Sequence, residues 1–188
     1  MLLLKLFLFF GLVLHKVIWE VLRTKAPSQT PSSASLTIVA VKLVKIAIFI
    51  GILVQIWLPD VLPIGNEGSF WIRAAGVLLF SLGLLTAISA RVQLGDNWSN
   101  IESGQVLTNQ SVVDRGIYAY VRHPIYTGDL LLLIGLELAL NSWLVVLALL
   151  LCPIVMWKAI KEERMLLREL SGYIEYHRRT KRFIPFVI

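Results

Sequence analysis

Residues 130–157 read LLLLIGLELALNSWLVVLALLLCPIVMW, and this apolar segment decides the fold. Its polar residues are Glu137 and the pair Asn141-Ser142. As a single helix the segment would be about 42 Å long at about 1.5 Å per residue, whereas the hydrocarbon core of a bilayer is roughly 30 Å thick. Two shorter helices that turn at Asn141-Ser142 are the alternative.

The charges that flank this segment distinguish the two interpretations. Basic residues occur in the linker 23–35, in the polar stretch 91–124 and in the tail 158–188, whereas the turn at 59–70 has acidic residues only. The positive-inside rule places the three basic segments in the cytoplasm and the 59–70 turn outside. An even number of crossings must then separate residues 124 and 158, which favours a helical hairpin that turns at Asn141-Ser142.

The composition of the whole chain is that of an integral membrane protein. Of its 188 residues, 57% are hydrophobic and 16% are charged, whereas soluble domains are about 45–50% apolar and about 25% charged. Three further apolar segments, Leu2–Leu22, Leu36–Leu58 and Trp71–Ala90, precede the hairpin. The first has no small-residue cleavage site of a signal peptide at its end, so we expect it to be a span. The sequence therefore predicts an all-α integral membrane protein with about five transmembrane helices, the last two a helical hairpin, and with the N-terminus outside.

The polar stretch 91–124 ends in residues suited to a functional site. Connections longer than about 12–15 residues are usually functional or disordered. This one ends in tyrosines and in Arg122-His123-Pro124, so a cation and a titratable imidazole stand where the chain enters the bilayer. If the hairpin forms, Glu162 and Glu163 return to the same depth. We therefore expect carboxylates, an imidazole and aromatic rings around one pocket that faces the cytoplasm.

Each of these residues also has a purely structural interpretation. Arg122 alone would be an interfacial anchor, and the tyrosines alone would form an aromatic belt. Glu162 and Glu163 would belong to an exposed helix face with spaced ion pairs. Glu137 is costly inside a bilayer, which favours a functional role, unless it lies near the turn and reaches water. The order and spacing of these residues together favour a site.

This order of motifs resembles that of the isoprenylcysteine carboxyl methyltransferase family and its relatives among the phospholipid methyltransferases. The resemblance covers roughly half of the chain. Its motifs are Leu94-Gly95-Asp96-Asn97-Trp98-Ser99, Gly116-Ile117-Tyr118, Arg122-His123-Pro124-x-Tyr126-x-Gly128, Glu162-Glu163-x-x-Leu166, Tyr173-x-x-Tyr176 and Arg182-Phe183-Ile184-Pro185. It divides the chain into three N-terminal transmembrane helices (1–90) and a methyltransferase core with a cofactor-binding loop, the hairpin and a basic helical tail (91–188).

The resemblance implies a cofactor, S-adenosylmethionine, bound between the loop and the hairpin. The positions that match cofactor contacts of the family are Ser103, Gln110, Val112, Val113, Tyr118, His123, Pro124, Ile125, Tyr126 and Glu162. Lys158 stands near a substrate-contacting arginine of the family, and Arg122 and Glu163 are the predicted catalytic residues. The sequence departs from the family at Gln110, which replaces a histidine, and at Leu170-Ser171, which replaces Phe-Gly.

The chemistry of the methyl acceptor decides whether the site needs a general base. A carboxylate is already ionised at pH 7 and needs none. An amine is protonated and must lose a proton before it attacks, for which His123 or Glu163 is the candidate base. Arg122 would orient the acceptor or offset its negative charge.

The sequence thus predicts a multi-pass membrane methyltransferase that acts on a lipophilic acceptor from the bilayer, with the carboxylate of an isoprenylcysteine-like substrate favoured. The alternatives are a phospholipid or other small-lipid methyltransferase, and a non-catalytic transport or scaffold protein on the same fold. A reductase is disfavoured because no Gly-x-Gly-x-x-Gly fingerprint occurs. No metal site is expected, since His15, His123 and His177 lack ligand spacing. We expect membrane lipids as partners, no nucleic acid and no obligate protein partner, because the basic residues flank apolar spans.

Overall fold

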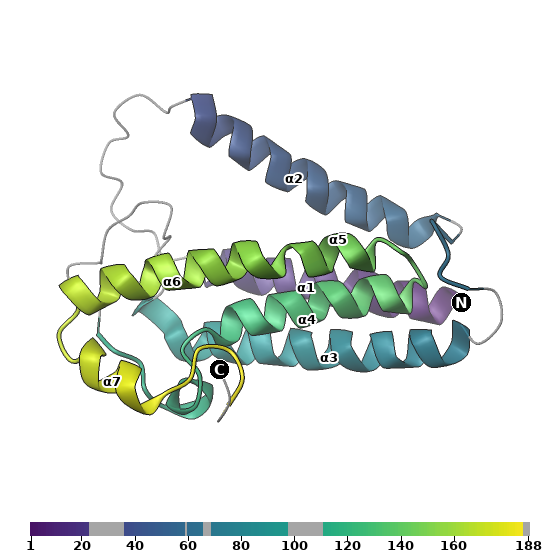
Figure 1. Ribbon diagram of the computed structural model, residues 1–188. Coiled ribbons are helices and arrows are strands. Elements are labelled where there is room, and N and C mark those ends of the chain that lie inside the picture. Colours follow the sequence, from purple (N-terminus) through teal and green to yellow (C-terminus); the bar gives the residue numbers. More distant parts are fainter. Residues whose placement is uncertain (23–35, 59, 66–68, 98–110, 186–188) are drawn as a thin grey trace.

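The computed structural model describes residues 1–22, 36–58, 60–65, 69–97 and 111–185 (Figure 1). Within these ranges the chain forms helices joined by short connections, with two isolated β-bridges and no sheet. The elements are α1 (Leu2–Val21), α2 (Leu36–Trp57), α3 (Ser69–Leu94), η1 (Gly95–Asn97), η3 (Gly116–Ala119), α4 (Pro124–Ala139), α5 (Val145–Leu150), α6 (Cys152–Glu169) and α7 (Tyr173–Arg179). The all-α fold predicted from the sequence is confirmed for these residues.

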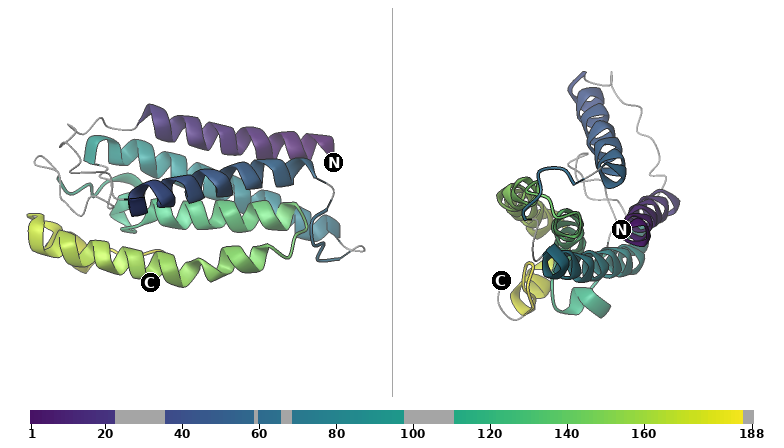
Figure 2. Two further views of the ribbon diagram at one scale, coloured as in Figure 1. Left: turned by 90° about the horizontal axis from the view of Figure 1, so that it is seen from above. Right: turned by 90° about the vertical axis from the view of Figure 1, so that its right-hand side faces the viewer.

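Four of the helical segments run side by side along one direction. Figures 1 and 2 show α1, α3, α4 and the α5–α6 pair lying lengthwise next to one another, with α2 tilted away from them. The N-terminus lies at one end of the bundle, and α7 lies at the other. Two of the described helices, α1 and α3 from Phe70, are long and apolar enough to cross a membrane.

Helices α3 and α4 pack through glycines that let their backbones touch. A Cβ atom added to Gly76 would lie 2.1 Å from the backbone nitrogen of Ala139, and one added to Gly83 would lie 2.3 Å from that of Leu132. Small residues at a helix interface permit this close approach. Because the earlier glycine of α3 meets the later residue of α4, the two helices are antiparallel. Their contact therefore sets the register of α4 against α3.

The segment 130–157 does not form one helix. Helix α4 ends at Ala139, and Asn141 has a φ of 56°, a left-handed conformation that asparagine adopts more readily than most residues. Backbone hydrogen bonds then tie the turn to residues 62–64, from Ile64 N to Asn141 O and from Trp143 N to Leu62 O. The chain reverses direction here, and α5 and α6 run back alongside α4 (Figure 1).

Polar side chains link α1 and α2 to the bundle. His15 Nε2 of α1 lies 3.0 Å from an Asp129 carboxylate oxygen of α4, and Gln55 of α2 donates a hydrogen bond of 2.8 Å to Glu137. Glu137 is buried and lies near the turn at Asn141, at the opposite end of α4 from His123. Its polar contact is therefore a connection between helices, remote from the predicted site.

The glycine contact predicts which substitution the bundle tolerates. Gly83→Ala should lower the melting temperature, because its Cβ would collide with the backbone of α4 and overpacking typically costs about 1–3 kcal/mol. Gly51→Ala in α2 is the matched control, since nothing lies within 4 Å of the added Cβ. It should leave stability unchanged or raise it by up to about 1 kcal/mol through helix propensity. Thermal unfolding in detergent measures both, and equal melting temperatures would contradict this account of the packing.

Candidate functional site

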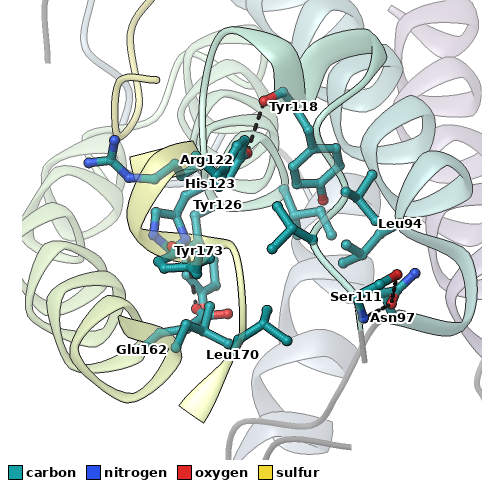
Figure 3. A pocket seen from close by; sticks show the side chains of 15 residues that line it. Leu94, Asn97, Ser111, Tyr118, Arg122, His123, Tyr126, Glu162, Leu170 and Tyr173 are labelled. Atoms are coloured by element: carbon teal, nitrogen blue, oxygen red, sulfur yellow. Dashed lines mark hydrogen bonds and ion pairs between the residues drawn. The ribbon is translucent and has the colours of Figure 1, made fainter. Parts of the chain in front are cut away.

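A pocket lies at the end of the bundle where α4 begins (Figure 3). Its empty volume, including the open space at the mouth, is about 720 Å³. It is lined by the described residues Leu94, Asn97, Ser111, Val112, Val113, Tyr118, Arg122, His123, Ile125, Tyr126, Glu162, Leu166, Leu170, Tyr173 and Tyr176. The C-terminal end of α3, the first turn of α4, the second half of α6 and helix α7 thus contribute to one cavity.

Most of the residues predicted to hold the cofactor meet at this pocket. Val112, Val113, Tyr118, His123, Ile125, Tyr126 and Glu162 line it. Pro124 is buried and opens α4, a position that suits proline because the first helical N–H has no partner within the helix. Ser103 and Gln110 lie outside the described residues. Of the residues predicted to act on the acceptor, Arg122 lines the pocket, whereas Glu163 and Lys158 do not.

The backbone of residues 120–123 is fixed by the end of the chain. Arg122 N donates to Lys181 O at 2.8 Å, His123 N donates to Arg182 O at 3.0 Å, and Lys181 N donates to Tyr120 O at 3.0 Å. These bonds form a short parallel bridge between segments far apart in the sequence. They hold the His123 backbone at the start of α4, so the imidazole emerges at the pocket wall.

Glu163 is a buried acid whose carboxylate contacts two arginines and a histidine. Its side chain is 4% exposed, its Oε1 lies 2.7 Å from Arg122 Nε and 3.2 Å from His123 Nε2, and its Oε2 lies 2.7 Å from Arg182 Nη2. Burial alone would raise the pKa of Glu163, but the hydrogen bonds with His123, Arg182 and Arg122 outweigh burial and hold this pKa far below its usual range. These contacts therefore contribute their full stability at any pH above 4.5, the ordinary pKa of glutamate. Their contribution is lost as the pH falls from there through the lowered pKa of Glu163.

Glu162 faces the pocket, and its pKa is shifted in the opposite direction from that of Glu163. Tyr126 donates a hydrogen bond of 3.1 Å to Glu162 Oε2, and His123 Nδ1 lies 3.7 Å from the same oxygen. Burial raises the pKa of Glu162, although His123, Tyr126 and Lys158 oppose the rise. No arginine contacts it among the described residues. The two acids are adjacent on α6 and so point about 100° apart, one into the cavity and the other into the cationic cluster behind it.

Aromatic side chains with polar groups form another part of the pocket wall. The rings of His123 and Tyr126 are stacked, with centroids 5.4 Å apart and planes 13° from parallel. Tyr176 donates a hydrogen bond of 2.9 Å to the carbonyl of Tyr118, and Figure 3 shows the Tyr118 ring directed toward Leu94 in the cavity. Burial raises the pKa of Tyr118, so its hydroxyl stays neutral and can donate a hydrogen bond to a ligand.

Lys158 lies at the edge of the site. Its Nζ is 5.8 Å from the centroid of the Tyr126 ring, and it precedes Glu162 by one turn of α6. Arg122, by contrast, does not present its charge to the cavity. Figure 3 shows its guanidinium directed away from Leu94 and Ser111, and Nη1 donates to the carbonyls of His177 (3.1 Å) and Thr180.

Sequence reasoning did not assign several residues of the site. Leu94, Asn97, Leu166, Tyr173 and Tyr176 belong to the quoted motifs, so their spacing was an available signal. Ser111 and Leu170 also line the pocket. Ser111 lies between the predicted contacts Gln110 and Val112, and Leu170 stands at the Phe-Gly position of the family, but neither was predicted to contact the cofactor.

Known proteins share both the sequence pattern and the fold. A family model described as phospholipid methyltransferase matches residues 71–172. The protein-S-isoprenylcysteine O-methyltransferase of Schizosaccharomyces pombe is 32% identical over 56% of this chain and 46% of its own length. The cobalt-zinc-cadmium resistance protein CzcN of Cupriavidus metallidurans is 35% identical over 57% of this chain and 50% of its own length.

A solved structure shows a related fold. It is that of a eukaryotic intramembrane Ras methyltransferase, isoprenylcysteine carboxyl methyltransferase, which superposes with a TM-score of 0.58 at 23% identity and covers 98% of this chain and 68% of that one. The chain spans about half the length of the curated relatives it matches. Since the family model covers more than half of the chain, the family expected from the motifs is confirmed: this chain belongs to the phospholipid methyltransferase family.

Proposed function

We propose that this chain is a membrane methyltransferase that moves a methyl group from S-adenosylmethionine to the carboxylate of an isoprenylcysteine-like lipophilic acceptor. The observation that carries the proposal is the pocket in which Glu162, a carboxylate with no arginine partner among the described residues, faces aromatic and apolar walls. Relatives that are 32% and 26% identical over more than half of this chain bear the name protein-S-isoprenylcysteine O-methyltransferase.

The residues of the pocket fit the proposed cofactor. S-adenosylmethionine carries a positive sulfonium, an ammonium group, ribose hydroxyls and a flat adenine. Glu162 is suited to the ammonium or the hydroxyls, because a carboxylate accepts strong charge-assisted hydrogen bonds. Val112, Val113 and Tyr126 offer apolar and aromatic surface to the adenine. When bound, the cofactor supplies the reactive methyl group, while the protein supplies orientation and electrostatics.

The surroundings of the candidate base Glu163 favour a carboxylate acceptor over an amine. A protonated amine must transfer a proton to a base before it attacks. Glu163 is a poor base, since its contacts with Arg122 and Arg182 keep its pKa low. An acceptor that is already ionised needs no base, and the Lys158 cation at the edge of the pocket would attract it.

The membrane arrangement is part of the proposal. Helices α1, α2, α3 and α4 and the α5–α6 pair up to Trp157 would each cross the bilayer, which gives five crossings with the N-terminus outside. The cofactor site would then face the cytoplasm, where the basic tail lies. The alternatives are a phospholipid methyltransferase, which the description of the family model favours, and a non-catalytic protein on the same fold.

Glu162→Gln should weaken the binding of S-adenosylmethionine. A charge-assisted hydrogen bond contributes about 1.5–3 kcal/mol, so the dissociation constant should rise about ten- to a hundredfold at about 1.4 kcal/mol per decade. Wild-type affinity should also fall as the pH decreases through the raised pKa of Glu162, because protonation removes the charge. The variant should lack this pH dependence. Calorimetry in detergent measures both effects.

Glu169→Gln is the matched control, since Glu169 is an exposed acid on the same helix. It should bind the cofactor as the wild type does. A folded wild-type protein that binds neither S-adenosylmethionine nor its demethylated product would contradict the enzyme proposal, and equal affinities of all three proteins would contradict the role of Glu162.

Lys158→Gln should raise the KM for a prenylcysteine analogue with a free carboxylate, by about tenfold if one charge-assisted contact is lost. Lys161→Gln is the control, because Lys161 is exposed and lies over the Trp157 ring. Transfer of labelled methyl groups to the analogue, measured in lipid nanodiscs, gives both KM values. Methylation of phosphatidylethanolamine in its place would favour the phospholipid alternative.

Single cysteines test the proposed topology. In a Cys152→Ser background, which removes the single cysteine of the chain, Leu62→Cys and Ser171→Cys place thiols at exposed positions of the two ends of the bundle. A membrane-impermeant maleimide should label them from opposite sides of sealed vesicles, with Ser171 on the cytoplasmic side. Labelling of both from one side would rule out this arrangement.

A further inference from the structure

The C-terminal segment 180–183 packs behind the wall of the pocket. Besides the backbone bonds to residues 120–123, Thr127 Oγ1 donates to Phe183 O at 3.3 Å, and the Phe183 ring lies 5.8 Å from the His123 ring. As far as the described residues go, the lining of the pocket includes none of these four C-terminal residues. The segment therefore contacts the residues that form the site and stays outside the cavity itself.

Arg182 binds Glu163 with a two-pronged contact. Its Nη2 lies 2.7 Å from Oε2, and its Nε lies 3.1 Å from both carboxylate oxygens. Such a planar fork fixes the orientation of the carboxylate as well as its position, which a lysine cannot reproduce. The side chain of Arg182 is 26% exposed and that of Glu163 is 4% exposed, so the contact is largely shielded from water.

The orientation of Glu163 determines what its other oxygen can hold. Oε1 takes Arg122 Nε at 2.7 Å and His123 Nε2 at 3.2 Å. If Arg182 were removed, His177 Nε2, at 3.6 Å, would remain near Oε2. The carboxylate could then rotate, and His123 would lose a fixed partner at the pocket wall.

We propose that Arg182 is a positioning residue of the methyl-transfer site. It binds Glu163 through hydrogen bonds to both carboxylate oxygens, and Glu163 in turn orients His123 in the pocket wall. The inference rests on the proposed function, because it concerns binding of the methyl donor at this pocket. It also assigns Glu163 a role behind the site, in the orientation of His123 and Arg122, in place of a direct role in the reaction.

The test compares Arg182→Gln and Arg182→Lys with the wild type, all as full-length protein in detergent. We expect the dissociation constant of S-adenosylmethionine to rise about tenfold or more for Arg182→Gln, as for the loss of one charge-assisted contact, while the KM for the carboxylate acceptor is unchanged. Arg182→Lys keeps the charge without the fork and should give an intermediate affinity. It also provides a folded variant if Arg182→Gln does not fold. Arg178→Gln is the control, since Arg178 is an exposed arginine of α7.

A double-mutant cycle tests the route through Glu163. Because both residues act through one contact, Arg182→Gln combined with Glu163→Gln should bind the cofactor as weakly as Glu163→Gln alone. Additive losses of affinity would overturn the positioning role. So would dissociation constants of the Arg182 variants within about twofold of the wild-type value. In either case, cofactor binding by the wild type leaves the proposed function intact. Absence of cofactor binding by the wild type would overturn the proposed function and this inference with it.

Discussion

The close contact between α3 and α4 is the constraint on which the rest of the structure depends. Two helices can approach until their backbones touch only where glycines leave the space, and Gly76 and Gly83 do so against α4. Helix–helix association in a bilayer gains little from the hydrophobic effect, so packing of this kind and polar contacts must hold the bundle together. The register of this contact sets the position of α4 along α3. Because α4 begins at Pro124, it also sets where His123 and Tyr126 lie at the end of the bundle. The site inherits its geometry from a contact formed largely by residues without side chains.

The second determinant is the difference in how the charges of the neighbouring Glu162 and Glu163 are compensated. Glu163 is compensated by Arg122 and Arg182, and these contacts offset the cost of its burial and stabilise its charged form at neutral pH. Among the described residues, a tyrosine hydroxyl and a more distant imidazole are the partners of the Glu162 carboxylate. The nearby Lys158 charge does not cancel the effect of burial, which raises the pKa of Glu162, so burial of its charge costs stability. Such a cost is characteristic of functional sites, where a group is held ready for a ligand that compensates it. One helix thus carries a carboxylate compensated by arginines and, in our proposal, a carboxylate that binds the cofactor, separated by about 100° of rotation.

Much of this arrangement could be predicted from the sequence, and the limits have physical causes. The flanking charges and the Asn141-Ser142 pair predicted that the segment 130–157 is not one helix, and α4 ends at Ala139. The transmembrane hairpin itself stays a prediction. The expected hairpin and the resemblance to the methyltransferase family predicted that Tyr118, His123, Tyr126 and Glu162 share one pocket, and all four line it. The role of the C-terminal segment could not be predicted, because Arg182 meets Glu163 only through a tertiary contact. Nor could the direction of the Arg122 guanidinium, since a residue type at a motif position does not determine its rotamer.

The position of the pocket along the bundle agrees with the chemistry that we propose. A charged, water-soluble methyl donor must approach from the aqueous side, whereas an isoprenylcysteine-like acceptor keeps its apolar chain in the bilayer. The two can meet only near the interface, and the pocket is built where α4 starts, between polar residues such as Glu162 and apolar ones such as Leu94 and Leu166. Helix α4 has 16 residues and is about 24 Å long at about 1.5 Å per residue, less than the roughly 30 Å of the hydrocarbon core. A helix this short leaves the pocket at its first turn within reach of both phases, provided that its other end lies at the opposite side of the membrane.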